Sequence, residues 1–162
     1  MPSHSPHAEY EISTDPMRLD VTVIHAFLTQ SYWSPGIPRA VVERAISNSL
    51  CFGLYHKAER VAPGAKAQTE QVGFARVITD KATFAYLADV FILDAHRGRG
   101  LSKWLVQIIK VHQDLQGLRR FLLATRDAHR LYQQFEFREL SNPSSMMEIV
   151  KPDVYRVSSL GQ

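Results

Sequence analysis

The sequence predicts one mixed α/β (α+β) domain, in which a central, mostly antiparallel mixed sheet carries helices on both faces. A chain of 162 residues, 45% hydrophobic and 22% charged, can bury a real core. Strand-like runs in the middle of the chain are separated by short turns, which favours antiparallel pairing. Residues 84–124 then follow the order strand, turn, helix, strand, a crossover typical of two parallel strands. We treat residues 1–162 as a single domain with a core from about residue 8 to 151 and loose termini.

The first half of the chain is expected to contain two helices and four strands. Residues 8–13 have a strand pattern, and Asp20 can cap a helix that ends at Ser34-Pro35-Gly36. Pro38 suits the first turn of a second helix. Apolar runs predict further strands at residues 50–55, 72–78 and 82–93.

The second half alternates between helical and strand-like segments. Residues 101–112 place apolar side chains at helical spacing, with Leu101, Trp104, Leu105, Ile108 and His112 on one face. Residues 121–124 are typical of a buried strand, and Asp127 can cap a last helix through Phe135. Residues 137–140 and 146–150 resemble two final strands, which gives a sheet of about six or seven strands.

The segment at residues 94–103 has the properties of a phosphate-binding turn. Gly98 and Gly100 lack a Cβ, so the backbone can curl and direct several N–H groups to one point. The helix that begins near Leu101 adds unpaired N–H groups and a partial positive charge. Full positive charges nearby come from Arg97, Arg99 and Lys103. Together these features predict a site for a diphosphate group.

Spacing excludes two common phosphate-binding loops. A nucleoside triphosphate loop needs a glycine five residues before a Gly-Lys pair, which the chain lacks. A dinucleotide fingerprint needs a third glycine where Lys103 stands. The remaining pattern, Arg97-x-x-Gly100-x-Ser102, resembles the Q/R-x-x-G-x-G/A signature of the GNAT superfamily of N-acetyltransferases.

This resemblance covers about residues 10–150 and implies the GNAT fold, in which the fourth and fifth strands splay apart to admit a pantetheine arm. It implies acetyl-CoA as co-substrate, with the main-chain N–H of Ile92 as the expected contact of the acetyl carbonyl. For Asp127 a plain helix cap is the favoured alternative, and Arg130 can equally be solvated. The coenzyme-binding positions carried over from the family are Phe91, Ile92, Leu93, Arg97, Gly98, Arg99, Gly100, Leu101, Ser102, Thr125, Asp127 and Arg130.

Asp89 is the first candidate catalytic residue, because it interrupts an otherwise apolar strand. Burying a carboxylate costs several kcal/mol unless it is paired, and desolvation would raise its pKa and make it a usable base. A protonated amine must lose its proton, directly or through a water, before it attacks a thioester. The alternatives are a solvated position or a pair with an arginine; members of the superfamily often carry an acidic residue here.

Tyr132 is the second candidate. The segment from Ala128 to Phe137 resembles the family pattern A-x-x-L-Y-x-x-x-G-F, which implies that Tyr132 protonates the leaving thiolate. A thiol pKa of about 8.5 and a phenol pKa of about 10 are roughly matched for this transfer. The alternative is a ring that only packs in the core. Glu136 stands where the family usually has glycine, so a left-handed end of this helix is less comfortable.

The acceptor site is the least defined part. Tyr32 and Trp33, in the loop at residues 30–38, and Tyr86 are weak candidates for contacting the substrate, and the two loop aromatics can equally be a lid over the core. The resemblance implies that a primary amine of a small molecule or peptide attacks the thioester directly through a tetrahedral intermediate. No cysteine nucleophile is needed, and Cys51 has no local signature of one.

Composition argues against several other classes of protein. The net charge is +3 at pH 7, but no Lys/Arg run exceeds two residues, so we expect no nucleic-acid partner. No apolar run approaches the ~20 residues that span a bilayer, so we expect no membrane partner. The seven histidines lack metal-binding spacing, apart from His4-x-x-His7 in a segment expected to be disordered, and we predict no metal site.

A single cysteine and the lack of a signal-peptide pattern predict a cytoplasmic protein. The resemblance also makes a homodimer possible. Two rival functions stay open at this point. One is a GNAT-like module that binds an acyl-CoA without turnover. The other is an interaction domain that uses Arg97, Arg99 and Arg119-Arg120 as a basic patch.

Overall fold

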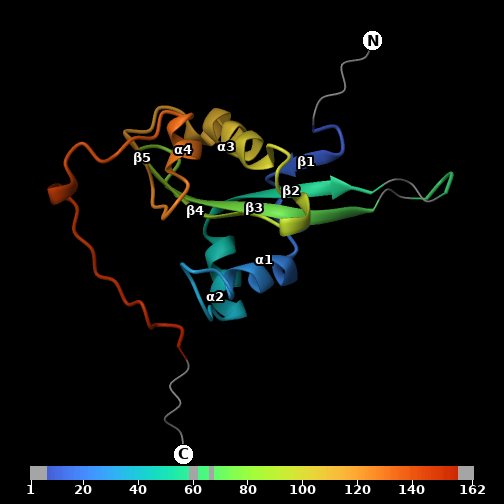
Figure 1. Cartoon of the computed structure of the whole chain (residues 1–162), viewed down its shortest axis with the longest axis horizontal. Coiled ribbons are helices and arrows are strands. Elements are labelled where there is room, and N and C mark those ends of the chain that lie inside the picture. Colours follow the sequence, from blue (N-terminus) through green and yellow to red (C-terminus); the bar gives the residue numbers. More distant parts are fainter. Residues whose placement is uncertain (1–6, 59–61, 66–67, 157–162) are drawn as a thin grey trace, which may run out of the picture.

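The computed structural model describes residues 7–58, 62–65 and 68–156 of the chain. In these ranges it confirms the mixed α/β fold, with five strands in one sheet in the order β1-β2-β3-β4-β5 (Figure 1). The strands are β1 (Tyr10–Ser13), β2 (Leu50–Lys57), β3 (Thr69–Thr79), β4 (Phe84–Ile92) and β5 (Arg120–Leu123). The α-helices are α1 (Val21–Leu28), α2 (Arg39–Ser47), α3 (Leu101–Val111) and α4 (His129–Gln133).

The strand directions follow the predicted connections. Neighbours from β1 to β4 pair antiparallel, and β4 pairs in parallel with β5 after the crossover through α3. The turn between β3 and β4 is held by Asp80, whose carboxylate accepts hydrogen bonds from the N–H groups of Ala82, Thr83 and Phe84. The Thr83 hydroxyl also donates to Asp80, and these bonds hold the pKa of that carboxyl well below its usual range.

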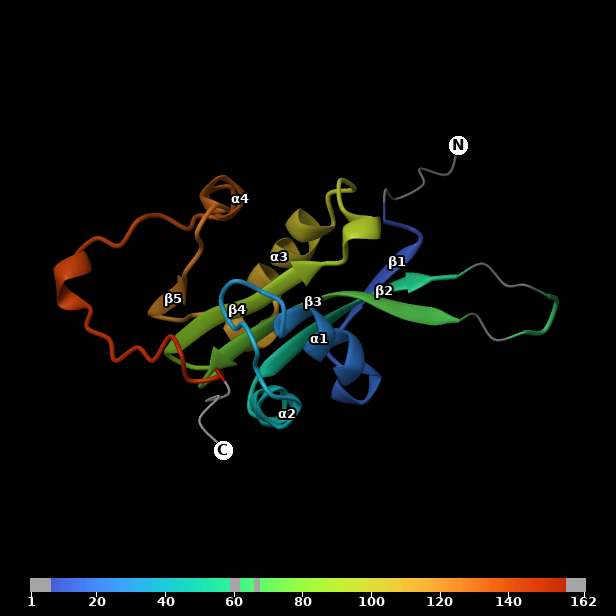
Figure 2. The same cartoon turned by 60° about the horizontal axis from the view of Figure 1, so that its bottom comes forward.

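Helices cover both faces of the sheet, α3 and α4 on one and α1 and α2 on the other (Figures 1 and 2). On the first face, α3 packs on β2, β3 and β4 through four buried side chains, those of Leu101, Leu105, Val106 and Ile109. The inward face therefore includes Val106 and Ile109, while His112 lies just beyond the end of the helix. On the second face, Ile24 and Leu28 of α1 meet Phe74 and Phe91 of the sheet.

The start of α1 is the predicted one. Asp20 occupies the N-cap, and its carboxylate accepts a hydrogen bond from the N–H of Val23 at 3.2 Å. The N–H of Asp20 in turn donates to the side chain of Gln71 on β3 at 2.7 Å, which fixes the helix entry against the sheet. None of the helices in the described ranges is long and apolar enough to cross a membrane.

A β-bulge in β4 separates β4 from β5. Phe74 pairs with Phe91 and Arg76 pairs with Ala88, so the single β3 residue between them faces two residues of β4. The first of these, Asp89, has a positive φ of 55°. Parallel pairing with β5 runs only as far as Leu87, although β4 continues to Ile92. The two strands diverge beyond the bulge, as the GNAT resemblance implies.

The two final strands predicted at residues 137–140 and 146–150 are absent from the described structure. This segment contains only a short 3-10 turn at Pro143–Ser145 and runs out beyond β5 before it returns toward α2 (Figures 1 and 2). Strand-forming side chains need a neighbouring strand to pair with, and these two segments pair with no strand of the described residues. The side chains of Met147 and Ile149 are accordingly 96% and 94% exposed.

The C-terminal tail is more ordered than predicted. Beyond Pro152, the half-buried side chain of Tyr155 packs against the cluster on the α1 and α2 face, beside Gly36. The prediction of loose ends otherwise falls on residues 1–6 and 157–162, which lie outside the described residues.

The helix that carries Tyr132 begins and ends differently from the prediction. It runs only from His129 to Gln133, and Asp127 is not its cap; instead the Thr125 hydroxyl accepts a hydrogen bond from the N–H of Ala128 at 3.0 Å. Asp127 is exposed, 3.7 Å from Arg126. At the other end, Glu136 takes a left-handed φ of 71°.

The end of α4 is a Schellman motif with glutamate in the glycine position. The N–H of Phe137 bonds to the carbonyl of Tyr132 at 3.3 Å, and the N–H of Glu136 bonds to that of Gln133 at 3.4 Å. The helix therefore closes as the family pattern implies, although a residue with a Cβ must adopt a strained conformation there.

Replacing Glu136 by glycine should relieve this strain. Both Glu136→Gly and Glu136→Ala remove the ion pair with Lys110, which is 3.0 Å long. The difference in stability between the two variants therefore measures the cost of the left-handed backbone conformation at position 136. We expect the glycine variant to have a free energy of unfolding about 1 kcal/mol higher than the alanine variant in urea denaturation. Equal stabilities would mean that position 136 carries no such strain.

Candidate active site

Two cavities meet at Tyr132. The first, of about 480 Å³, is the glycine-turn cavity; its lining includes Ile92, Gly98, Gly100 and Ser102. The second, of about 560 Å³, is the aromatic cavity; its lining includes Tyr32, Tyr86 and Asp89. Four residues line both cavities: Trp33, Val90, Ala128 and Tyr132. Both cavities lie where β4 has diverged from β5. A molecule in one cavity can therefore reach a molecule in the other.

The predicted glycine turn is present, and its two glycines adopt left-handed backbone conformations. Gly98 and Gly100 have φ values of 76° and 73°, which a residue with a Cβ rarely adopts. Gly100 is the N-cap of α3 and provides no side-chain cap, so the first N–H groups of that helix are not capped by it. A Cβ at Gly98 would meet no atom within 4 Å, which leaves the turn open on that side. The turn thus combines main-chain donors, the positive end of a helix dipole and free space.

The charged side chains of the turn have different roles. Arg97 folds back onto its own loop, where its Nε donates to the carbonyl of Ile92 at 3.0 Å and its guanidinium pairs with Asp94 at 2.9 Å. Arg97 therefore stabilises the turn from within. Arg99 and Lys103 are exposed at the turn and Arg130 is exposed on α4. Leu101 is buried in the core, so only its main chain can serve a ligand.

The end of β4 directs one main-chain N–H toward the opening. The N–H of Leu93 donates to Val72 on β3 at 2.8 Å, and its carbonyl accepts from His96 at 2.9 Å, so the Leu93 main chain is engaged within the protein. Along an antiparallel strand, the main-chain N–H and C=O groups of successive residues point to alternate sides. Those of Ile92 therefore point away from β3, to the side where β5 no longer pairs with β4.

The Phe91 ring stacks on Phe27 at 4.0 Å, on the α1 face.

Tyr132 is the most buried of the four residues that line both cavities. Its side chain is 8% exposed, and its ring contacts that of Phe137 edge to face at 5.9 Å. Burial raises the pKa of the Tyr132 phenol to about 12. The hydroxyl is therefore protonated at neutral pH and can act as a proton donor at the junction of the two cavities, although the raised pKa matches that of a thiol less closely than the sequence predicts.

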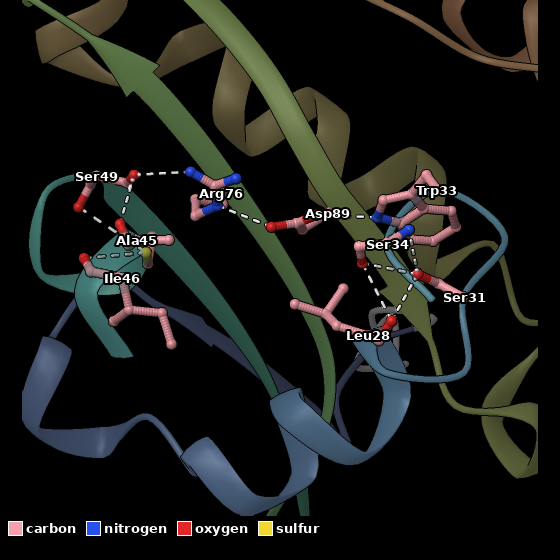
Figure 3. A network of polar contacts seen from close by, with 10 residues as sticks. Leu28, Ser31, Trp33, Ser34, Ala45, Ile46, Ser49, Arg76 and Asp89 are labelled. Carbon is pink, nitrogen blue, oxygen red and sulfur yellow. Dashed lines mark hydrogen bonds and ion pairs between the residues drawn. The ribbon is translucent and has the colours of Figure 1, made fainter. Parts of the chain in front are cut away.

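Asp89 pairs with an arginine, which was one of the predicted alternatives (Figure 3). One carboxylate oxygen accepts from Arg76 Nε at 2.8 Å and the other from Trp33 Nε1 at 2.9 Å. Arg76 also donates to the hydroxyl of Ser49 at 3.2 Å. Both members of the pair are largely buried, with side chains 16% and 11% exposed. This network fixes the loop at residues 29–38 to the bulge of β4.

The predicted aromatic residues come together in one wall. Trp33 packs near Phe27 in addition to its bond with Asp89. The Tyr32 ring lies under the guanidinium of Arg126 at 3.9 Å, and its hydroxyl accepts from the N–H of Arg126 at 3.3 Å. These contacts join the first loop to the segment between β5 and α4. Tyr86 lines the same cavity from β4.

Sequence reasoning missed Arg76, Arg126 and Tyr155, which also line the aromatic cavity. A signal for Arg76 existed, because this charge interrupts an apolar strand as Asp89 interrupts the next one. Two opposite charges inside adjacent antiparallel strands are candidates for a buried pair. For Arg126 and Tyr155 no local pattern was available, since each reaches the cavity through the tertiary fold.

Two other kinds of site find no support in the structure. Burial raises the pKa of the Cys51 thiol to about 12, so it is a poor nucleophile. No group of three His, Cys, Asp or Glu side chains in the described residues is placed to hold a metal ion. His4 lies outside the described residues, so its predicted spacing with His7 has no structural counterpart here.

The chain is similar to proteins assigned to the acetyltransferases. Residues 47–139 match the model of the acetyltransferase (GNAT) domain. A Gibberella zeae protein assigned to the acetyltransferases, FG08082, is 38% identical over 143 residues, covering 81% of this chain and 80% of that protein.

Solved structures agree with this similarity. A Xanthomonas campestris pv. campestris protein assigned to the GNAT family is 49% identical, with a TM-score of 0.81 over 91% of this chain and 97% of that one. A Clostridium acetobutylicum protein assigned to the acetyltransferases, determined with acetyl-CoA, shares the fold at 11% identity. Its TM-score is 0.56, over 87% of this chain and 94% of that one.

The pair between Arg76 and Asp89 should behave as an energetic unit. Asp89→Asn leaves Arg76 without a counter-charge while keeping a residue that tolerates positive φ, and should lower the free energy of unfolding by about 2 kcal/mol. Adding Arg76→Met should recover about half of this loss, because no charge then stays buried alone. Urea denaturation of both single variants and the double variant measures the coupling. Strictly additive losses would show that the two residues act independently.

Proposed function

Because the chain belongs to the GNAT family of acetyltransferases, we propose that it transfers an acetyl group from acetyl-CoA to a primary amine of a small molecule or peptide. One observation carries this proposal. The glycine-turn cavity and the aromatic cavity meet at a buried, protonated phenol, so two substrates can approach each other beside Tyr132.

In the proposed complex, the coenzyme occupies the glycine-turn cavity. The main-chain N–H groups from Gly98 to Ser102 and the start of α3 would hold the pyrophosphate. Arg99 and Arg130 would supply positive charge from the rim, while Thr125 and the diverged end of β4 would flank the pantetheine arm. The acetyl-CoA found with the Clostridium acetobutylicum protein supports a coenzyme of this type, although that protein shares only the fold with this chain.

The proposed reaction is a direct attack of the amine on the thioester. The free amine forms a bond to the acetyl carbon, and the carbonyl oxygen becomes an oxyanion that the N–H of Ile92 stabilises. Collapse of this tetrahedral intermediate breaks the carbon–sulfur bond, and Tyr132 donates its proton to the leaving thiolate. The second proton, which the nitrogen loses as the amide forms, returns to the Tyr132 phenolate and restores the phenol. The proton that the ammonium loses goes to Asp89, directly or through a water.

The aromatic cavity is the proposed site of the acceptor. Tyr32, Trp33 and Tyr86 offer ring surface for the apolar part of an amine. Asp89 lies among them with both carboxylate oxygens already hydrogen-bonded. The carboxylate therefore keeps a fixed orientation while an acceptor binds next to it.

A thiol-release assay with acetyl-CoA and a panel of primary amines tests the proposal. The panel should include amino acids, polyamines, aminosugars and peptides with free N-termini. Release of coenzyme A that depends on one class of amine is the expected result. Tight coenzyme binding in calorimetry without turnover of any amine would favour the alternative of an acyl-CoA-binding module.

Gly98→Asp should weaken coenzyme A binding. It places a negative charge in the turn that is proposed to hold a pyrophosphate, so the dissociation constant should rise by at least about tenfold in calorimetry. Gly64→Asp is the matched control, because Gly64 also has a left-handed φ and open space around a Cβ, but lies in a distant loop. Equal binding by the two variants would exclude the glycine turn as the pyrophosphate site.

Tyr132→Phe should lower the rate of acetyl transfer by about a hundredfold, with coenzyme binding unchanged, because the ring stays and only the proton donor is lost. The raised pKa of the phenol also has a consequence for the wild-type enzyme. Its neutral form persists as the pH rises, so ionisation of Tyr132 should cause no fall in rate up to about pH 9. A rate unaltered by Tyr132→Phe would remove Tyr132 as the acid.

A further inference from the structure

Three ring side chains join the glycine turn to the first two strands of the sheet. They are Tyr10 of β1, His56 of β2 and His96, which comes just before the turn and lines the glycine-turn cavity. The His56 ring centroid lies 5.1 Å from that of Tyr10 and 5.1 Å from that of His96. The rings of Tyr10 and His96 meet edge to face at 5.7 Å. We call these three side chains the histidine cluster.

The histidine cluster favours an uncharged His96. The Tyr10 hydroxyl lies 2.9 Å from Nδ1 of His96, and it donates to that nitrogen when the neutral ring carries its proton on Nε2. Tyr10 is buried and His96 is half-buried, so this contact is sheltered from water. Burial, the neighbouring His56 and the guanidinium of Arg99 each lower the pKa of His96, burial most of all.

The acidic groups around His96 offset this effect only in part. Glu70 of β3, which pairs with His56 in the sheet register, raises the pKa of His96 but is outweighed. Asp94 lies on the same short turn as His96, and it is engaged in an ion pair with Arg97 at 2.9 Å. An anion that binds on the side of the glycine turn would therefore change the balance of charge at His96.

Two further basic side chains face the same turn. The His7 ring stacks on Trp104 of α3 at 4.6 Å, and its Cε1 lies 3.9 Å from the position that a Cβ on Gly100 would occupy. Lys103 lines the glycine-turn cavity from α3. An anion on the turn would favour the protonated form of His7 as well, so substitutions must separate the contribution of His7 from that of His96.

A diphosphate on the glycine turn would reverse the charge balance around His96. It would offset the charge of Arg99 and place negative charge close to the imidazole. A nearby opposite charge favours the protonated ring, so the pKa of His96 should rise when the diphosphate binds. Linkage then requires that the affinity for the diphosphate increases as the pH falls, because the bound state holds more protons than the free state.

We propose that His96 is a proton-linked member of the coenzyme site, which takes up a proton from solvent when the diphosphate binds and releases it when the coenzyme leaves. Coenzyme A then binds more tightly in mild acid than at neutral pH. The gain begins as the pH falls through the pKa of His96 in the complex, and it is complete below the lower pKa of His96 in the free protein. This inference rests on the proposed function, since it needs the pyrophosphate to lie on the glycine turn.

Calorimetry of coenzyme A binding tests the proton uptake. Titrations at about pH 6.5 in two buffers of different ionisation enthalpy count the protons taken up, and wild type should take up more than His96→Gln. Between about pH 7.5 and pH 5.5, the dissociation constant of wild type should fall at least about threefold relative to that of His96→Gln. Ionisation of the coenzyme's own phosphates is common to both proteins and cancels in this ratio.

Two other histidine variants serve as controls. His25 lies on α1, on the opposite face of the sheet, where its Nε2 is 3.0 Å from the carbonyl of Ile37. His25→Gln should therefore take up as many protons as wild type, and His7→Gln measures the share of His7. Equal proton uptake by wild type and His96→Gln would overturn the proposal.

His56→Gln distinguishes a titrating cluster from a merely structural one. Loss of His56 removes one of the causes that lower the pKa of His96, so the pH of maximal proton uptake should move upward. A purely structural role for these rings would leave that pH unchanged. NMR titration of the His96 ring in wild type, with and without coenzyme A, needs no substitution. A pKa of His96 that coenzyme A does not raise would overturn the proposal.

The outcomes separate this inference from the proposed reaction. If coenzyme A binds with proton uptake that depends on His96 but no amine is acetylated, the inference stands and the proposed transfer fails. If amines are acetylated but proton uptake does not depend on His96, the inference alone fails. If coenzyme A does not bind at any pH, both are overturned.

Discussion

The bulge of β4 at Asp89 is the constraint on which the rest of the site depends. It turns β4 away from β5 after Leu87, so the end of β4 has no parallel neighbour. A main-chain N–H at Ile92 and two cavities become available where a continuous sheet would have closed the space. The bulge stores strain at a positive φ, and the Arg76 pair and the Trp33 hydrogen bond hold Asp89 in place.

The Asp89 carboxylate also connects β4 to the loop that walls the aromatic cavity. Asp89 fixes Trp33, and Trp33 fixes the loop that walls the aromatic cavity. Burying Arg76 and Asp89 together avoids the cost of a lone buried charge, but it also means that neither can change without the other. The position of the loop therefore depends on this ion pair. Across the opening, Tyr132 is placed by a short helix that ends on a strained Glu136.

The sheet also shows that a segment with strand propensity forms a strand only when another strand is available to pair with it. The segments at residues 137–140 and 146–150 have strand-forming composition, yet they pair with no strand of the described residues. Strand propensity describes a fit to a pleated, half-covered surface, so it is realised only when such a surface is present.

The sequence by itself determined the features that depend on local chemistry. Periodicity placed β1 to β5 and α1 to α3, the glycines at 98 and 100 predicted a tight turn before a helix, and Asp20 predicted a cap. It also selected Asp89 and Tyr132 as residues of interest, although their catalytic roles stay predictions. These inferences succeed because each needs only residues close in the chain.

Only the tertiary structure decided which partner each side chain meets. Asp89 pairs with Arg76 rather than with solvent, and the last two predicted strands do not form; both outcomes depend on groups distant in sequence. The last helix begins after Ala128 and is not capped by Asp127, while the Thr125 hydroxyl accepts from the N–H of Ala128. A sequence pattern records propensity, whereas the balance between desolvation, pairing and strain is settled when the elements pack together.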